Sequence, residues 1–315
     1  MSNSARPDAW TARDGEPILV TPELLRGWPL SRPDDDGEGR GKDRRGSVLV
    51  VGGSVEAPGA ILLAGTAALR AGAGKLQIAT CRDVAPGIAI AVPEARVLGL
   101  TQSDSGDIDP AAAERLVAAI ASAPAALIGP GMLDIATVRE VLRRVLPRVR
   151  GTALALDAGA LSAVSDDARV LHHLDGNVVL TPHTLELSLM LGIDEAEVHG
   201  DLLGVARGAA ADARAVVALK GARTYIAAPD GASYCYEGGN IGLATSGSGD
   251  TLAGVIAGLL ARGADATQAA VWGVYLHGAA GEVMARRMGP LGFLARELLA
   301  EIPGLMAAFD APTEE

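Results

Sequence analysis

Hydrophobic and polar positions alternate in a regular way along the chain from Ser47 onward. Short apolar runs with the length of buried strands are followed by longer alanine-rich segments with helical spacing, and glycines separate the two. The runs that predict strands cover residues 47–51, 75–80, 96–100, 125–128, 152–156, 177–180, 215–219, 223–228 and 232–236. The segments that predict helices cover residues 60–71, 111–121, 138–145, 184–191 and 202–212, and almost everything after Thr251. Repeated strand–helix alternation predicts a mostly parallel central sheet with helices on both faces.

The first 46 residues lack this alternation. Residues 1–17 are polar and are expected to form a disordered tail, whereas residues 22–28 predict a short helix with Thr21 as its N-cap. Residues 31–46 are charged and glycine-rich, which fits either a surface loop or linker, or a mobile flap over a ligand. Because the chain shows no internal repeat and no break in composition, we expect residues 18–312 to form a single domain.

Composition narrows the class of protein. The 315 residues include 40 glycines but only 3 Trp, 4 Tyr and 2 Phe, so the core is built from small aliphatic side chains that suit strands covered on both faces. The net charge of −11 argues against non-specific binding to nucleic acids or anionic membranes. The two cysteines, Cys81 and Cys235, form neither a disulfide framework nor a zinc pattern, and we expect both to be buried and reduced. Without a signal peptide or a membrane-spanning run, the expected compartment is the cytoplasm.

Glycine-rich or small-residue turns follow five of the predicted strands. In open parallel sheets, ligands bind outside the carboxyl ends of the strands, so these turns are expected to converge on one site. The turns are Gly52-Gly53-Ser54, Gly129-Pro130-Gly131, Asp157-Ala158-Gly159-Ala160, Thr181-Pro182-His183 and Lys220-Gly221.

The strongest local signal is the turn Thr245-Ser246-Gly247-Ser248-Gly249-Asp250 before the apolar segment 252–260. Its glycines allow several backbone N–H groups to face an anion, and the following helix directs the positive end of its dipole at the same point. Asp250 is either the N-cap of that helix or a general base that removes a proton from an attacking hydroxyl in phosphoryl transfer. The turn is neither a Walker A loop nor a dinucleotide fingerprint. Further along, Gly254 and Gly258 are expected to allow close helix packing.

Two further residues that directly follow predicted strands have side chains suited to binding or catalysis. Lys220 either is solvated or contacts a phosphate. His183 either is a hydrogen-bonded structural residue or belongs to the site. Glu186 could support the start of a helix or hold water around a metal ion, but neither it nor His183 belongs to a zinc pattern. No metal ligand is therefore assigned from the residues.

Eight motifs occur in one order between about Thr21 and Ala308: residues 48–54, 59–61, 67–74, 129–131, 157–161, 180–183, 219–222 and 239–250. Together they resemble the ADP- or ATP-dependent NAD(P)H-hydrate dehydratases, lyases of metabolite repair with a ribokinase-like fold. The resemblance implies a three-layer α/β/α domain. It also implies that the hydroxyl of hydrated NADH or NADPH is phosphorylated at the expense of ADP or ATP and that phosphate is then eliminated, which restores NAD(P)H.

The same resemblance implies roles for individual residues. Asp250 matches the base and a substrate contact. The pocket for the damaged cofactor matches Ala60, Gly131 and His183. The nucleotide-binding stretches match Lys220, Gly221, Ala222, Arg223, Thr224, Gly247 and Gly249. The family implies Mg²⁺ and a homo-oligomer, a dimer or tetramer. Its bacterial members often carry an epimerase domain, and the 46 residues before Ser47 are too few for one, so none is expected at the N-terminus.

Three motifs depart from the usual family pattern. Ser246 stands where the family has glycine, Thr184 and Leu185 follow His183 where it has Pro-Gly, and Gly159 lies in a motif that usually has a second Asp. These changes leave two alternatives open. One is a small-molecule kinase on the same fold that phosphorylates a vitamin or sugar hydroxyl. The other is a nucleotide-binding regulator without turnover.

Overall fold

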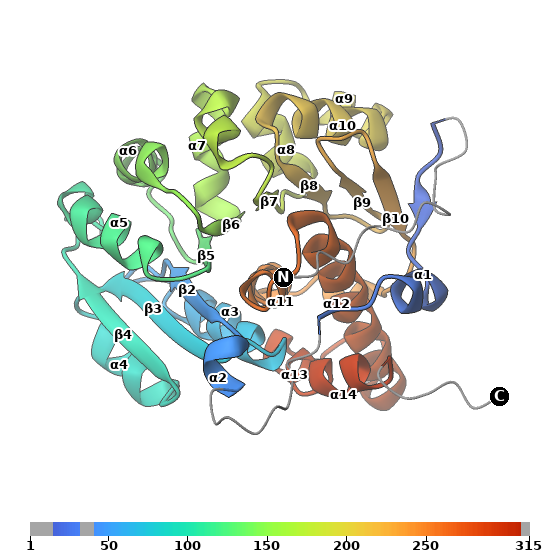
Figure 1. The fold of residues 1–315 in the computed structure, drawn as a ribbon, viewed down its shortest axis with the longest axis horizontal. Helices are drawn as coiled ribbons and strands as arrows, with labels where there is room; N and C mark the ends of the chain where they lie inside the picture. The colour runs from blue at the N-terminus through green and yellow to red at the C-terminus, as the bar shows by residue number, and fades with distance from the viewer. Residues whose placement is uncertain (1–14, 32–40, 310–315) are drawn as a thin grey trace.

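The computed structural model describes residues 15–31 and 41–309, and in this part of the chain ten strands form one sheet (Figure 1). The strand order is β1-β10-β9-β8-β7-β6-β5-β2-β3-β4. Only β9 among them runs antiparallel to its neighbours, β8 and β10, so the prediction of a mostly parallel sheet is confirmed. The strands are β1 (Ile18–Leu19), β2 (Ser47–Val51), β3 (Lys75–Cys81), β4 (Ala95–Leu100), β5 (Ala125–Ile128), β6 (Ala153–Leu156), β7 (Val178–Leu180), β8 (Val216–Leu219), β9 (Thr224–Ala227) and β10 (Ser233–Tyr236).

Helices cover both faces of the sheet because successive side chains of the buried strands point to opposite sides. Val48 and Val50 of β2 join one apolar core, and Leu49 and Val51 join the other. On the first face lie α1 (Pro22–Gly27), α3 (Gly59–Arg70), α4 (Ala85–Ala91), α11 (Ser248–Ala261), α12 (Ala266–Met288), α13 (Ala295–Leu298) and α14 (Ile302–Ala307). On the second lie α5 (Ala113–Ala121), α6 (Ile135–Val145), α7 (Ser162–Asp166), α8 (Thr184–Leu191), α9 (Glu195–Gly200) and α10 (Leu202–Ala213). The three-layer α/β/α architecture is therefore as predicted (Figure 1).

The N-terminal region differs in part from the sequence-based expectation. Thr21 does cap α1, because its hydroxyl accepts a hydrogen bond from the backbone N–H of Leu24 at 3.3 Å. The segment 31–46 was expected to be irregular, but residues Gly41–Arg44 form the short helix α2. The rest of the proposed flap, residues 32–40, lies outside the described residues, as do residues 1–14 of the expected tail. No helix within 15–31 and 41–309 has the length and apolar character needed to cross a bilayer.

Candidate active site at the carboxyl edge of the sheet

The five turns predicted to converge do lie in one row. They follow β2, β5, β6, β7 and β8, which are neighbours in the sheet. Backbone hydrogen bonds join one turn to the next: Gly53 N–H donates to the Pro130 carbonyl at 2.8 Å, and Lys220 N–H donates to the Pro182 carbonyl at 2.8 Å. At Gly129 a side chain would collide with the carbonyl of Asp157, so glycine is required where the β5 and β6 turns meet.

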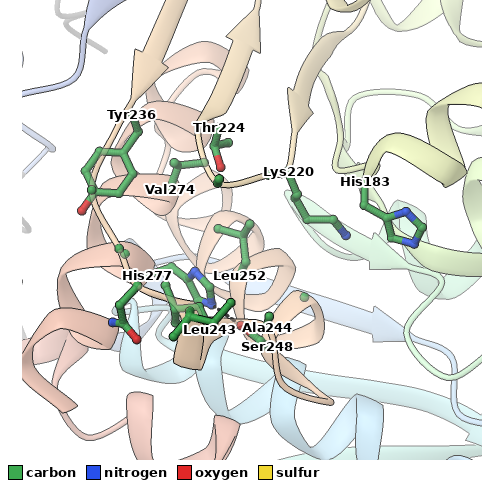
Figure 2. A pocket seen from close by; sticks show the side chains of 18 of the residues that line it. His183, Lys220, Thr224, Tyr236, Leu243, Ala244, Ser248, Leu252, Val274 and His277 are labelled. Atoms are coloured by element: carbon green, nitrogen blue, oxygen red, sulfur yellow. Dashed lines mark hydrogen bonds between the residues drawn. The ribbon is translucent and has the colours of Figure 1, made fainter. Parts of the chain in front are cut away.

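A cavity of about 820 Å³ opens beside this row (Figure 2). Lys220 and His183 lie at one end of it, and the opposite wall comes from α12 and from the loop between β10 and α11. Its size falls within the range of small-ligand pockets, and its walls combine apolar side chains with a few polar groups. The lining residues are His183, Lys220, Gly221, Ala222, Thr224, Tyr236, Gly238, Gly239, Asn240, Ile241, Leu243, Ala244, Thr245, Ser248, Gly249, Leu252, Val274, His277 and Gly278.

The glycine-rich turn brings the N-terminus of α11 to this cavity. Gly247 occupies the N-cap position with a φ of 86°, a conformation that side chains disfavour, and no side chain caps the helix. Asp250 therefore lies inside the first turn, and the interpretation of Asp250 as the N-cap is wrong. Ser246 has no positive φ, so the replacement of glycine at this position imposes no left-handed strain. The Ser248 N–H donates to the Thr245 carbonyl at 3.2 Å, so the first-turn N–H groups that can face an anion are those of Gly249 and Asp250.

Helix α11 packs against α3 without side chains between the two backbones. A Cβ atom at Gly254 would collide with the carbonyl of Ala64, and one at Gly258 would collide with the carbonyl of Ala68. This confirms the predicted role of the two glycines in helix packing. The two contacts are four residues apart on both helices, so the helices run in parallel and in register. Asp250 is four residues before Gly254 and Ala60 four residues before Ala64, so both belong to the N-terminal ends of these two helices.

Four charged groups meet where α11 approaches the strand ends. Lys220 Nζ lies 3.1 Å from Asp157 Oδ1 and 3.5 Å from Glu186 Oε2. Its side chain is only 20% exposed, so the interpretation of Lys220 as a solvated lysine is wrong. Burial opposes the charged ammonium, but the two carboxylates outweigh that effect and raise the pKa of Lys220 above its usual value. Buried Asp157 also accepts a hydrogen bond of 2.7 Å from the hydroxyl of Thr181.

Asp250 has the properties of a base that works near neutral pH. Burial is the main cause that raises its pKa to about 6, and the negative charges of Asp157 and Glu186 raise it further. Lys220 acts in the opposite direction and lowers it. A carboxylate with such a pKa is ionised at neutral pH and still accepts a proton readily, which suits general-base catalysis.

His183 and Glu186 form a reciprocal cap at the start of α8. The Nδ1 atom of His183 accepts a hydrogen bond from the Glu186 N–H at 3.2 Å, and the Glu186 carboxylate accepts one from the His183 N–H at 2.8 Å. The structural interpretation of His183 and the helix-supporting role of Glu186 are both confirmed. The imidazole is nevertheless about half exposed and lines the cavity, so capping does not remove it from the site.

The predicted site residues other than Asp250 fall into groups that differ in their relation to the cavity. The residues that line the cavity are Lys220, Gly221, Ala222, Thr224, Gly249 and His183. Ala60 and Gly131 do not line it but touch each other, because a Cβ on Gly131 would lie 3.0 Å from the Cβ of Ala60. Arg223 points away: its guanidinium is 3.1 Å from Glu237 and its side chain is 62% exposed. Gly247 also lies outside the lining and packs against Leu63 of α3.

The sequence analysis assigns no site role to Ser248 or His277, which both line the cavity. Ser248 Oγ and His277 Nε2 form a buried hydrogen bond of 2.9 Å between the start of α11 and the middle of α12. Burial lowers the pKa of His277 to about 4, so the imidazole is neutral at physiological pH. The sequence gives little indication that His277 belongs to the site. It lies inside a long helix of small and apolar residues, where a lone histidine could equally be a core residue.

Comparisons with known proteins agree with the geometry. The family model for NAD(P)H-hydrate dehydratase matches residues 48–304. A protein of Xanthomonas campestris pv. campestris named ADP-dependent (S)-NAD(P)H-hydrate dehydratase is 48% identical over 287 residues, which cover 91% of this chain and 95% of that protein. A Bacillus subtilis protein of the same name is 36% identical, over 88% of this chain and 95% of its own length.

Solved structures show the same fold. The ADP/ATP-dependent NAD(P)H-hydrate dehydratase of B. subtilis, co-crystallised with ATP/Mg²⁺, has a TM-score of 0.77 at 32% identity and covers 93% of this chain and 98% of its own. A ribokinase-like superfamily protein of Enterococcus faecalis has a TM-score of 0.79 at 26% identity, with coverages of 95% and 98%. The fold expected from the motifs is confirmed, and the chain belongs to the NAD(P)H-hydrate dehydratase family of ribokinase-like proteins.

Proposed function

We propose that the protein catalyses the ADP- or ATP-dependent dehydration of hydrated NADH or NADPH and so restores NAD(P)H. The observation that carries this proposal is the position of Asp250. It directly follows Gly249, which lines a cavity large enough for a nucleotide, and its helix packs against α3, the helix that carries Ala60. The names of the relatives, ADP-dependent (S)-NAD(P)H-hydrate dehydratases, support the same substrate and donor.

The chemistry explains why a kinase-like site suits a dehydratase. Hydroxide is a poor leaving group at neutral pH, whereas phosphate is a good one. Asp250 takes the proton of the ring hydroxyl as its oxygen attacks the terminal phosphorus of the nucleotide, which leaves as AMP from ADP or as ADP from ATP. The bond between the ring carbon and the phosphorylated oxygen then breaks with loss of a proton from the neighbouring ring carbon. The products are phosphate and the restored dihydronicotinamide.

We assign one set of site residues to the nucleotide that donates the phosphoryl group and another to the hydrated cofactor that accepts it. The first-turn N–H groups of α11 at Gly249, together with Lys220, are placed to hold the phosphate being transferred. Gly221, Ala222 and Thr224 form the wall for the rest of the nucleotide. The Arg223 side chain faces Glu237, so we propose that Arg223 contributes to nucleotide binding through its backbone. Gly247 is proposed to contribute through its left-handed conformation, which shapes the turn.

The damaged nicotinamide is proposed to bind on the other side of Asp250. Ala60 and Gly131 have no bulky side chain, so a flat ring can approach the backbone there. His183 is at the end of the cavity nearest Lys220, where it can contact a polar group of the same substrate (Figure 2). These assignments account for the two groups into which the site residues fall.

Mg²⁺ fits this site only together with the nucleotide. Among the described residues no group of three or more acidic, histidine or cysteine side chains could hold a metal ion alone. This agrees with the preference of Mg²⁺ for one or two carboxylates plus phosphates and water. Asp157 and Glu186 are the carboxylates that would face it, and the ion would offset charge on the transferring phosphoryl group.

The direct test is to incubate the protein with hydrated NADH, Mg²⁺ and either ADP or ATP, and to follow the return of reduced-nicotinamide absorbance. We expect recovery with at least one donor and release of one phosphate for each NADH. A folded sample that gives no recovery with either donor would refute the proposal. Accumulation of a stable phosphorylated product would indicate the alternative small-molecule kinase.

We also propose a location and an assembly for the protein. The substrates are an adenine nucleotide and a damaged nicotinamide cofactor, which supports a cytoplasmic enzyme. A homo-oligomer, dimer or tetramer, is consistent with α8, where Leu185 and Leu189 are exposed to solvent. Light scattering coupled to gel filtration would measure the assembly, and a mass near 31.9 kDa would contradict it.

A further inference from the structure

The hydrogen bond between Ser248 and His277 has a role that the dehydration chemistry does not require by itself. It is buried, it joins α11 to α12, and both residues line the cavity beside Gly249 (Figure 2). Ser248 is the first residue of α11, so its hydroxyl lies next to the N–H groups proposed to hold the phosphate. This inference rests on the proposed function only in taking the anion to be the phosphate of the nucleotide.

We propose that His277 is a positioning residue that donates a hydrogen bond from Nε2 to Ser248 Oγ, and that the Ser248 hydroxyl proton is thereby left to donate to a nucleotide phosphate. A neutral imidazole carries one N–H, and a hydroxyl has one proton and two acceptor positions. If the serine donated to the histidine, its proton would be used inside the protein. If the histidine donates, the hydroxyl becomes a further donor to the anion.

The surroundings of Ser248 favour this arrangement. Its backbone N–H is already used in a 3.2 Å bond to the carbonyl of Thr245, and the Thr251 hydroxyl donates to the carbonyl of Gly247 at 3.0 Å. The turn is therefore held by its own backbone and by Thr251, and the Ser248–His277 bond is not needed to close it. The Ser248–His277 bond fixes the direction of the Ser248 hydroxyl in the cavity wall. A ligand that accepts a hydrogen bond from this hydroxyl would explain why its direction is fixed.

The test measures nucleotide binding without any turnover. Calorimetry of ADP and of adenosine with Ser248→Ala and with His277→Leu is expected to show about tenfold weaker ADP binding and unchanged adenosine binding, because a hydrogen bond to a charged group is lost only with the phosphates. His277→Gln keeps an N–H donor and is expected to recover most of the ADP affinity. Ser188→Ala is the matched control, because Ser188 is equally buried but bonds to the Leu185 carbonyl of its own helix at 2.9 Å.

A second measurement tests the direction of the bond. The ¹⁵N chemical shifts of His277, assigned by comparison with His277→Gln, are expected to show a protonated Nε2 and an unprotonated Nδ1. The opposite tautomer would overturn the proposal, as would ADP affinities of Ser248→Ala and His277→Leu equal to wild type in folded samples. Because ADP binding is measured directly, failure of the dehydratase assay would leave this result standing, and the reverse also holds.

Discussion

Lys220 follows β8 and Asp157 follows β6, and these strands are separated by β7 in the sheet. Lys220 Nζ nevertheless lies 3.1 Å from Asp157 Oδ1. Thr181, at the end of β7, bonds to the same Asp157 oxygen. The pair balances charge within a cluster that also contains Glu186 and Asp250. The ammonium holds the strand ends together and lowers the proton affinity of the base, which burial raises. The first four predictions test these effects.

Replacement of the base should separate chemistry from binding. We expect Asp250→Asn to reduce dehydration of hydrated NADH by at least about a hundredfold, because general-base catalysis contributes 10²- to 10⁴-fold. ADP affinity should change little, since the first-turn N–H groups and Lys220 remain. Turnover assays and calorimetry on the same preparation would check this, and a variant that retains most of its activity would exclude Asp250 as the base.

The same substitution has a predicted effect on stability. The pKa of Asp250 is raised from 3.8 to about 6 in the folded protein, so its carboxylate form is penalised by folding. Stability that this group provides at low pH is therefore lost as the pH rises from about 4 to about 6. Asp250→Asn should remove the loss and raise the free energy of unfolding at pH 8 by on the order of 2 kcal/mol. Urea unfolding at pH 4 and pH 8 would show whether the gain is confined to the higher pH.

The pH dependence of activity should report the surroundings of Asp250. We expect kcat/KM to fall on the acid side with an apparent pKa of about 6, as the base becomes protonated. Glu186→Gln removes a charge that raises this pKa and keeps an amide able to cap α8, so the acid limb should move to lower pH. Glu140→Gln, which alters an exposed ion pair on α6, is the control and should leave the limb in place. An unmoved limb in both variants would contradict the electrostatic coupling.

Removal of Lys220 should have the opposite effect on the base. Lys220→Met eliminates the one charge that lowers the pKa of Asp250, so the acid limb should move to higher pH. It also leaves Asp157 buried without its cation, which we expect to cost about 3 kcal/mol of unfolding free energy. Lys75→Met breaks an exposed pair with Asp43 and should cost less than about 1 kcal/mol. Equal losses of unfolding free energy in the two variants would show that the buried pair stabilises the protein no more than the exposed pair does.

The contact between α3 and α11 gives a prediction about packing. Gly254→Ala or Gly258→Ala should destabilise the protein by about 1–3 kcal/mol or more, because the new methyl group meets a carbonyl of α3. Gly208→Ala is the matched control in the middle of α10, where no neighbouring atom lies within 4 Å. Alanine is the better helix former, so this variant should be more stable by about 0.5–1 kcal/mol. Denaturant midpoints for the three variants would decide the matter.

Much of the fold could be read from the periodic pattern, because the central strands are buried on both faces and carry unbroken apolar runs. Strands 47–51 and 125–128 were predicted with the bounds that they have in the structure. The two-residue strand β1 was not predicted, since two residues show no period. Helix α4 was missed for a related reason: Ile90 is 83% exposed, so its apolar residues do not mark a buried face.

Only part of the site could be predicted from the sequence. Residues that follow strands directly, such as His183 and Lys220, could be placed because the carboxyl ends of parallel strands meet at one edge. Partners brought in by tertiary packing could not. Ser248 was identified only as a member of the glycine-rich turn, and its bond to His277 depends on how α12 packs against α11. The side-chain direction of Arg223 likewise follows from its pairing with Glu237 across β9 and β10.

The backbone contact of α3 with α11 also determines how the enzyme can vary. Both helices begin at the site, one with Ala60 and the other with Asp250, and they are joined without adjustable side chains between them. We therefore expect a shift of α3 to move Ala60 and Asp250 together. Changes in substrate preference within this fold should instead arise in side chains that do not belong to this contact, such as His183, whose imidazole is about half exposed.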